Sequence, residues 1–300
     1  MSTSRPKVLG NYRNFVLPGD ASCPGCPIPI GLKIVSSATD GKGILVVPAC
    51  CTSVVVGTAP KTSMRMPIVH VPFASAAAVA SGLREALLVR GLEDKQVIVW
   101  AGDGGTADIG MASLSGAAEK NADIIYIMYD NEAYMNTGIQ RSSSTPRGAW
   151  TTTTPIMGKT EPKKDVARIM ISHDVPYVAT ASIAYPHDFY NKLQTSLKIR
   201  GFRFIQLHSP CPVGWRFDDS LTVDVARMAV ETGMWILYEY KNGAIEISNP
   251  SRYLIQQNKF KPIEEYIKIQ GRFASVDENT LKDLYEYRNR NIEFLNKLAK

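Results

Sequence analysis

Two short segments carry side chains that could bind a metal ion together with an anionic ligand. An apolar run at 96–101 leads directly into Gly102-Asp103-Gly104-Gly105, and a second run at 123–129 is followed by Asp130-Asn131. Asp103 and Asn131 should therefore lie at the carboxyl ends of two strands of one β–α–β unit, where open α/β sheets bind ligands. A carboxylate and an amide oxygen, with backbone carbonyls, suit Mg²⁺ shared with a diphosphate. The glycines let the backbone approach such a ligand, and a helix N-terminus just beyond favours phosphate. The simpler alternative is that Asp103 only caps a helix after a tight turn.

The cysteines offer a second chemistry. Cys23-Pro-Gly-Cys26 places two thiols on one turn, and Cys51 and Cys211 can complete a set of four, with Cys50 as the fifth cysteine of the chain. Four thiolates bind either Zn²⁺ or a 4Fe–4S cluster. Structural zinc sites usually use two close pairs, whereas here one pair is joined by two distant cysteines, which favours a cluster. The alternative is that Cys50, Cys51 and Cys211 are small buried apolar residues.

The elements that must position these residues alternate along the chain. Continuously apolar strands are expected at 44–48, 96–101, 123–129, 176–181 and 202–207, with helices at 73–90, 107–120, 163–173 and 186–199. This pattern predicts a doubly wound α/β fold with a mostly parallel sheet buried on both faces. The segments 1–43 and 131–162, rich in Gly and Pro or in Ser and Thr, interrupt the alternation, and a loop as long as the second is usually functional. We expect one α/β domain over 1–240 and a charged helical extension over 241–300, packed on the domain or on a partner subunit.

Composition narrows the class of protein. Of the 300 residues, 45% are hydrophobic and 21% charged, as in a globular protein. No apolar run reaches the length of about 18 residues that a membrane span requires, and no secretory signal is apparent, so we expect a cytoplasmic protein. The net charge of +6 is scattered and forms no arginine-rich arm, which argues against nucleic-acid binding. A basic face could instead steer an acidic protein partner.

Five segments of the chain resemble those of a known protein family. Cys23–Cys26, Pro48–Cys51, 102–110, 129–146 and 209–215 resemble, in order, segments of the β subunit of pyruvate:ferredoxin oxidoreductase, a 2-oxoacid:ferredoxin oxidoreductase. The resemblance runs from about residue 20 to 240, and the 129–146 stretch is the most specific. It implies the diphosphate-binding type of the thiamine-diphosphate-binding fold. The implied reaction converts a 2-oxoacid and coenzyme A into acyl-CoA and CO₂, with two electrons passing singly to ferredoxin.

The resemblance also implies roles for individual residues. Asp103, the Asn131 side chain and the Ala133 carbonyl would bind Mg²⁺, while Asn136 would face the thiazolium ring and the substrate. A larger set would complete the cofactor site: Gly102, Gly104 and Thr106 around the diphosphate, Thr137 and Gly138 in the same loop, and Cys23, Cys26, Cys51 and Cys211 around one 4Fe–4S cluster. Cys50 occupies a position that the family usually gives to a small residue that is not a ligand.

Partner subunits are implied as well. The family supplies the glutamate that contacts the aminopyrimidine ring, and most substrate contacts, from a separate α subunit; Glu132 lies inside the metal loop and is a poor candidate for this role. Further clusters would sit on a ferredoxin-like subunit or on ferredoxin. This chain alone should be inactive.

Substrate identity and two other classes of function stay open. Pro27-Ile28-Pro29 departs from the family, which usually has Gly after the second cysteine, and could reshape a nearby substrate pocket. Pyruvate leads, with 2-oxoisovalerate and oxalate as alternatives. The other classes are an iron–sulfur electron carrier without catalysis, which has no need of the Gly102–Gly104 turn, and a thiamine enzyme without redox activity that holds structural zinc.

Overall fold

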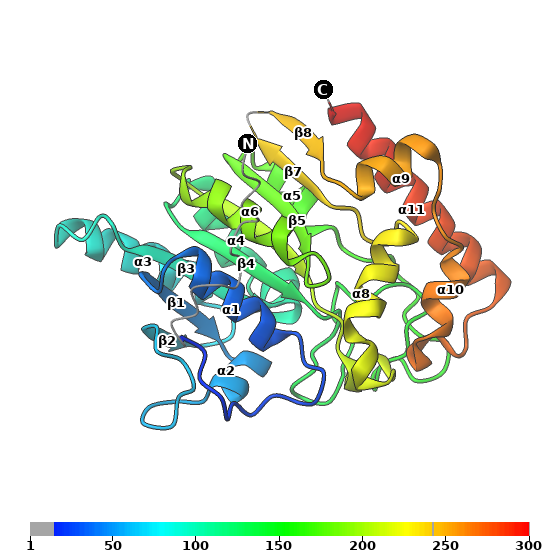
Figure 1. The fold of residues 1–300 in the computed structure, drawn as a ribbon, viewed down its shortest axis with the longest axis horizontal. Coiled ribbons are helices and arrows are strands. Elements are labelled where there is room, and N and C mark those ends of the chain that lie inside the picture. Colours follow the sequence, from blue (N-terminus) through cyan, green and yellow to red (C-terminus); the bar gives the residue numbers. More distant parts are fainter. Residues whose placement is uncertain (1–14, 242, 300) are drawn as a thin grey trace, which may run out of the picture.

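All strands belong to one sheet in the computed structural model, which describes residues 15–241 and 243–299 (Figure 1). The strand order is β2-β1-β3-β4-β6-β5-β7-β8. The first six strands in the chain run parallel, β7 is antiparallel to β5, and β8 is antiparallel to β7. Their bounds are β1 (Gly43–Pro48), β2 (Ile68–Val71), β3 (Gln96–Gly102), β4 (Ile125–Asp130), β5 (Tyr177–Ser182), β6 (Arg203–His208), β7 (Tyr238–Lys241) and β8 (Ala244–Ile247).

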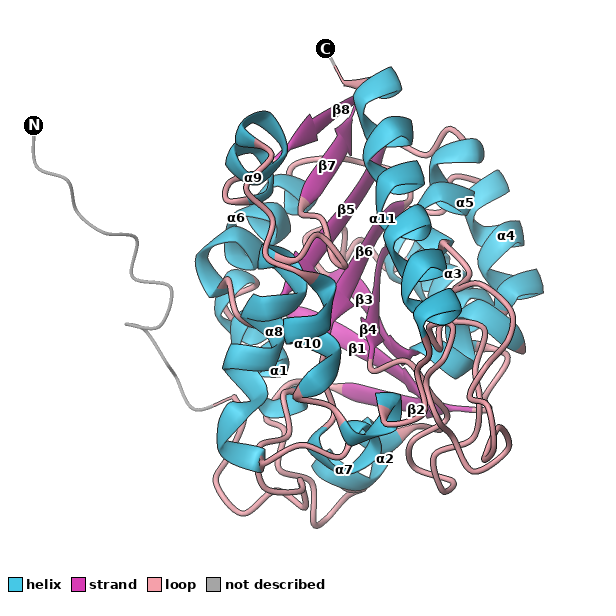
Figure 2. Cartoon of the chain, turned by 90° about the vertical axis from the view of Figure 1, so that its right-hand side faces the viewer, coloured by secondary structure: helices cyan, strands magenta, loops and turns pink. Residues whose placement is uncertain are grey.

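Helices cover both faces of this sheet (Figure 2). One face packs against α3 (Ala76–Val89), α4 (Met111–Glu119), α5 (Val166–Ser172) and α11 (Glu278–Leu298). The other packs against α1 (Ile28–Ala38), α2 (Cys51–Val56) and α6 (Pro186–Leu197). The remaining helices form a smaller cluster or short connections: η1 (Gly104–Asp108), α7 (Pro212–Trp215), η2 (Asp219–Leu221), α8 (Thr222–Glu231), α9 (Ser251–Gln257), α10 (Ile263–Lys268) and η3 (Gly271–Phe273).

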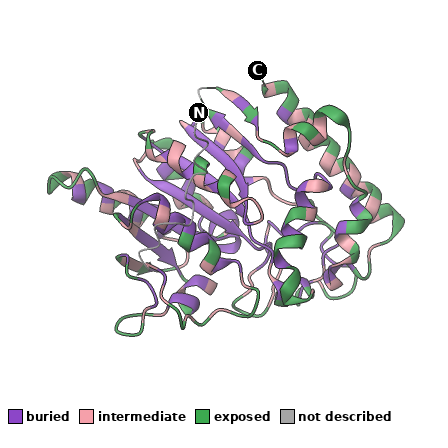
Figure 3. Ribbon diagram, in the orientation of Figure 1, coloured by how far each residue is buried: buried purple, intermediate pink, exposed green. Residues whose placement is uncertain are grey.

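Burial on both faces explains the continuous apolar strands. In β3, Val97 and Val99 pack into the core on the α3–α4 face, while Ile98 and Trp100 pack on the α1–α6 face. All four side chains are fully buried, as are the central strands as a group (Figure 3). A strand whose two faces are both covered has no face toward solvent, which is why apolar and polar residues do not alternate along it.

The strands predicted at 44–48, 96–101, 123–129, 176–181 and 202–207 are confirmed as β1, β3, β4, β5 and β6. The segment 1–43 is less irregular than expected, because α1 begins at Ile28 within it. Pro27 and Pro29 lie at the start of this helix, where proline removes no intrahelical hydrogen bond. The boundary expected at residue 240 lies within β7, and the following residues contribute β8 to the sheet as well as helices. Within the described residues, none of the helices combines the length and apolar character needed to cross a membrane.

The connections out of β1 and β3 diverge. β1 lies between β2 and β3, so the chain leaving β1 turns toward β2, whereas the chain leaving β3 turns toward β4 on the other side. Such a topological switch point leaves a crevice beyond the carboxyl ends of the two strands, where doubly wound folds bind ligands. Ala49 to Cys51 follow β1, and Asp103 follows β3, so the residues with predicted chemistry meet at this crevice.

Candidate cofactor site

A pocket of about 230 Å³ lies at the switch point. Its wall is formed by residues that follow β1, β3 and β4, and it brings together seven of the predicted cofactor-site residues: Gly102, Asp103, Gly104, Asn131, Ala133, Asn136 and Thr137. Cys50 and Cys51 line the same pocket. At Gly104 a Cβ atom would approach the Tyr134 ring to 2.5 Å, so this position requires glycine while the tyrosine closes one side of the pocket.

Three groups converge at the base of the pocket. The end of the Asn131 carboxamide lies 2.8 Å from Asp103 Oδ1 and 3.0 Å from the Ala133 carbonyl oxygen. With its nitrogen on this side, the carboxamide donates a hydrogen bond to each oxygen; with its oxygen on this side, three oxygens face one another. Asp103 is fully buried, and Asn131 and Ala133 are only 6% and 5% exposed. The residues predicted to bind Mg²⁺ are therefore neighbours in space.

The Asp103 carboxylate is held in place by a residue that the sequence reasoning missed. The hydroxyl of the fully buried Ser142 donates to Asp103 Oδ2 at 2.5 Å. Burial raises the pKa of Asp103 well above its usual range, and the nearby Asp130 carboxylate adds to this effect. A cation bound beside such a buried carboxylate would stabilise its charged form strongly.

The loop after Asn131 presents Asn136 to the pocket. Tyr134 and Gln140 exchange two backbone hydrogen bonds of 2.9 and 3.2 Å, so the residues between them form a tight turn. Asn136 and Thr137 are exposed at this turn, and the Thr137 hydroxyl donates to Gln140 Oε1 at 2.5 Å. Gly138 has a φ of +115° in the same turn but does not line the pocket.

Thr106 differs from the other residues expected around the diphosphate. It lies in η1 and is fully buried, but its hydroxyl donates to the Gly102 carbonyl at 2.7 Å and lies 3.1 Å from the Tyr126 hydroxyl. It is not part of the pocket wall. Its side chain therefore supports the turn after β3, and the contact of Thr106 with the diphosphate stays a prediction.

The four cysteines predicted as ligands come from three segments of the chain, and of these four only Cys51 lines the pocket. Cys23 and Cys26 form one turn, closed by the hydrogen bond from Cys26 N to Cys23 O at 3.0 Å. Cys51 begins α2, and Cys211 caps α7, where its Sγ accepts from Gly214 N at 3.4 Å. Burial raises the pKa of the Cys26 thiol to about 12, with Cys211 and Cys23 as further contributors. Burial also raises the pKa of Cys51, where Cys211, Cys50 and Cys26 contribute, so the thiols are electrostatic neighbours.

In the described part of the chain, no group of three or more His, Cys, Asp or Glu side chains is placed so that it could hold a metal ion. The segment Pro27-Ile28-Pro29, expected near the substrate pocket, starts α1 instead: Ile28 is buried in the core and lines no part of the switch-point pocket.

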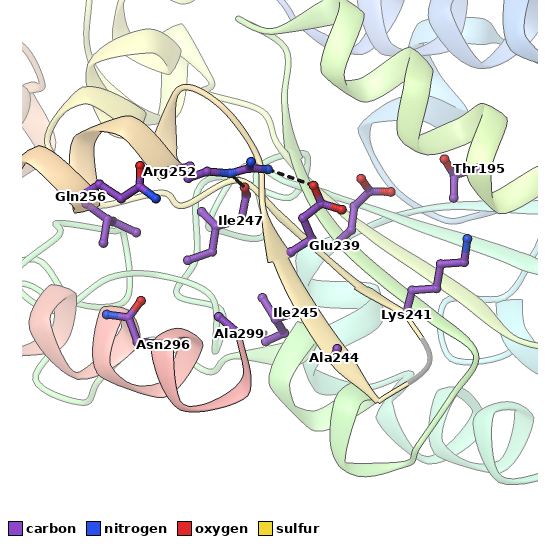
Figure 4. A pocket seen from close by; sticks show the side chains of 12 residues that line it. Thr195, Glu239, Lys241, Ala244, Ile245, Ile247, Arg252, Gln256, Asn296 and Ala299 are labelled. Carbon is purple, nitrogen blue, oxygen red and sulfur yellow. Dashed lines mark hydrogen bonds and ion pairs between the residues drawn. The ribbon is translucent and has the colours of Figure 1, made fainter.

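A larger cavity of about 770 Å³ lies at the other edge of the sheet, between the β7–β8 hairpin, α9 and the end of α11 (Figure 4). Its polar side chains include Arg252, which donates to Glu246 Oε1 at 2.9 Å and to the Ile247 carbonyl at 2.7 Å. None of the predicted site residues lines this cavity.

Comparisons with known proteins agree with the geometry of the switch-point pocket. Residues 49–207 match the family model described as thiamine pyrophosphate enzyme, C-terminal TPP binding domain. The chain is 47% identical over 291 residues to ketoisovalerate oxidoreductase subunit VorB of Pyrococcus abyssi, covering 94% of this chain and 92% of that protein. It is also 47% identical over 277 residues to pyruvate synthase subunit PorB of Methanothermobacter marburgensis, covering 91% and 94%.

A solved structure of 2-oxoglutarate:ferredoxin oxidoreductase from Magnetococcus marinus shares the fold, with a TM-score of 0.55 and 24% identity over 69% of this chain and 77% of that one. The predicted fold and family are thus confirmed. The chain belongs to the thiamine pyrophosphate enzymes, in the group of oxidoreductase subunits that includes PorB and VorB.

Proposed function

We propose that this chain is the subunit of a 2-oxoacid:ferredoxin oxidoreductase that binds Mg²⁺, the diphosphate of thiamine diphosphate and one 4Fe–4S cluster. The overall reaction converts a 2-oxoacid anion and coenzyme A into acyl-CoA, CO₂, one proton and two electrons, and the electrons leave singly. Thiamine diphosphate supplies the carbanion chemistry at the oxoacid carbonyl when it is bound. The chain's own residues bind and orient it, and provide the exit for electrons.

The convergence of Asp103, Asn131 and Ala133 is the observation that carries this proposal. Mg²⁺ prefers octahedral oxygen ligands at about 2.0–2.1 Å, so neighbouring ligand oxygens lie about 2.8–3.0 Å apart. The Asn131 carboxamide lies 2.8 and 3.0 Å from the other two oxygens, a spacing compatible with ligands of one cation. A cation would favour the amide oxygen on this side, because all three groups could then act as ligands.

The thiols support the cluster assignment. Around a single zinc ion four thiolates share one metal and crowd together, whereas around a 4Fe–4S cluster each thiolate binds a different iron and the sulfurs lie further apart. Cys211 contributes to the raised pKa of both Cys26 and Cys51, which supports one site shared by these thiols. Cys51 also lines the pocket that holds Asp103, so electrons would have a short path out.

The pocket is one half of a site. None of the described residues that line it is a glutamate, and the carboxylate of Glu132 is paired with Lys163 and Arg272 instead. Large apolar side chains are exposed on segments beside the pocket, including Val54 on α2, Ile109 after η1 and Val213 on α7. We propose that a separate α subunit covers this surface and supplies the glutamate and the substrate contacts. A ferredoxin-like subunit or ferredoxin would then accept the electrons.

Pyruvate is the proposed substrate, and 2-oxoisovalerate is the second candidate because a relative named for ketoisovalerate is as similar as one named for pyruvate. The test is anaerobic purification of the native complex, followed by a panel of 2-oxoacids assayed for coenzyme A-dependent reduction of a one-electron dye. Reduction with pyruvate above the other oxoacids supports the proposal. A colourless complex with stoichiometric zinc would contradict the redox function, and a cluster without any oxoacid oxidation would favour an electron carrier.

A further inference from the structure

Glu132 has an unusual backbone conformation between two proposed metal ligands. It follows Asn131 and precedes Ala133, and its φ of +65° lies in the left-handed region, which side chains with a Cβ rarely adopt. The residue is only 5% exposed. In this conformation the end of the Asn131 side chain lies 2.8 Å from Asp103 Oδ1 and 3.0 Å from the Ala133 carbonyl oxygen. Whatever holds Glu132 therefore also holds the metal ligands on either side of it.

Every polar atom of Glu132 is bound. Its N–H donates to Asp130 Oδ1 at 3.2 Å, and its carbonyl accepts from the Thr145 hydroxyl at 2.6 Å. Lys163 Nζ donates to its Oε1 and Arg272 Nη2 donates to its Oε2, both at 2.6 Å. A buried carboxylate with two ionic hydrogen bonds is fixed in direction as well as in charge.

Arg272 comes from η3, 140 residues further along the chain, and reaches the metal loop in two ways. Its guanidinium binds Glu132 and also lies 3.5 Å above the Trp215 ring. The Trp215 indole N–H in turn donates to the Asn131 carbonyl at 2.8 Å. The side chain of Lys163 is only 8% exposed. Its Nζ also lies 2.8 Å from Asp130 Oδ2, so it links Glu132 to Asp130.

We infer that Arg272, together with Lys163, is a positioning residue for the metal site: it fixes Glu132 in the left-handed conformation and thereby directs Asn131 and Ala133 at the cation. This inference rests on the proposed function, because it presupposes Mg²⁺ at these ligands. A purely structural role would be to anchor the C-terminal segment to the sheet, as any buried ion pair could.

The sign of the change in Mg²⁺ affinity distinguishes a positioning role of Arg272 from a simple effect of its charge. Removing the positive charge of Arg272 leaves the carboxylates of Asp103, Asp130 and Glu132 with less compensation. Through-space attraction alone would then strengthen Mg²⁺ binding. Loss of ligand position weakens it. Weaker Mg²⁺ binding in the variant therefore indicates lost ligand position, and stronger binding indicates a charge effect alone.

The test uses the native complex, depleted of metal and thiamine diphosphate with a chelator, and measures thiamine diphosphate retained as Mg²⁺ is added back. Arg272→Gln is expected to raise the Mg²⁺ concentration at half-saturation by about tenfold or more. Arg84→Gln is the matched control, because Arg84 is also buried and pairs with Asp123 at 2.7 Å, near the opposite end of β4. This control should lower the melting temperature without moving the Mg²⁺ midpoint.

An unchanged or lowered midpoint in Arg272→Gln, or an equal rise in Arg84→Gln, would overturn the inference. If Arg272→Gln does not assemble, Lys163→Gln removes the other cation that binds the Glu132 carboxylate; a raised midpoint there supports the inference, and an unmoved or lowered midpoint refutes it. The wild-type titration tests the proposed function separately, since failure of the wild type to retain thiamine diphosphate in response to Mg²⁺ would refute the function itself.

Discussion

Removing the hydroxyl of Ser142 should weaken the metal site without disturbing the fold. This hydroxyl donates to Asp103 Oδ2 at 2.5 Å, while Asp103 Oδ1 faces Asn131, so Ser142 sets the rotation of the carboxylate. A hydrogen bond to a charged group contributes about 1.5–3 kcal/mol. If that energy serves to orient the metal ligand, Ser142→Ala should weaken Mg²⁺ binding by about 10- to 100-fold.

The assay is Mg²⁺-dependent retention of thiamine diphosphate by the native complex. Ser81→Ala is a suitable control, because the Ser81 hydroxyl donates at 2.8 Å to a neutral acceptor, the Ala77 carbonyl within α3. We expect this control to leave the Mg²⁺ midpoint unchanged. A shift below twofold in Ser142→Ala would show that Asp103 keeps its orientation unaided, and tighter binding would show that Oδ2 is better used as a second metal contact; either result refutes the reasoning.

Three further predictions follow from other parts of the molecule. Cys51→Ser should remove the visible absorbance and iron of the anaerobically purified complex, whereas Cys50→Ser should retain both, because Cys51 has Cys26 and Cys211 as electrostatic neighbours; the opposite pattern would make Cys50 the ligand. Burial lowers the pKa of His208 to about 3, so the folded chain keeps this ring neutral while the unfolded chain takes up a proton below about pH 6.5. The free energy of unfolding should therefore fall as the pH falls below about 6.5, with His208 contributing about 1.4 kcal/mol per pH unit. Over the same pH range, the melting temperature of His208→Gln should fall less steeply than that of the wild type. Asp123 pairs with Arg84, Arg200 and the buried Arg203, so Asp123→Ala should destabilise the fold by about 3 kcal/mol or more while leaving the Mg²⁺ midpoint in place; a melting temperature equal to that of the wild type would contradict this.

The parts of the fold that the sequence predicts well are those decided by burial. β3 and β4 have core on both faces and appear as apolar runs in the sequence. The short edge strand β2 was missed, and so was α2, because neither is long enough to show a period. In α1 the prolines before and after Ile28 suggested a loop, but they occupy the first turn, where a helix tolerates them.

The same distinction applies to the site. Asp103 and Asn131 could be placed together from the sequence because each follows a strand, and parallel neighbouring strands end at one edge. Ser142 lies in a run of Ser and Thr whose members have no separate local signal. Arg272 is 140 residues from Glu132, and only the folded chain shows that they pair. The orientation of Thr106 toward the sheet likewise depends on the Tyr126 hydroxyl, which no local pattern indicates.

The strand order also constrains where a cluster could bind. Cys51 follows β1 and Cys211 follows β6, and these strands flank β3 and β4, which carry Asp103 and Asn131. Three strand intervals of about 4.8 Å separate β1 from β6 by about 14 Å. Cys211 nevertheless contributes to the raised pKa of Cys51, and the Thr222 hydroxyl, in α8 further along the chain from Cys211, donates at 2.8 Å to the Gly25 carbonyl between Cys23 and Cys26. Of the four cysteines predicted as ligands, Cys51 lines the switch-point pocket, so a cluster bound there would lie beside the loop that carries Asn131 and Ala133. A cluster in that position would adjoin both the cofactor and a docked electron acceptor, as transfer of single electrons requires.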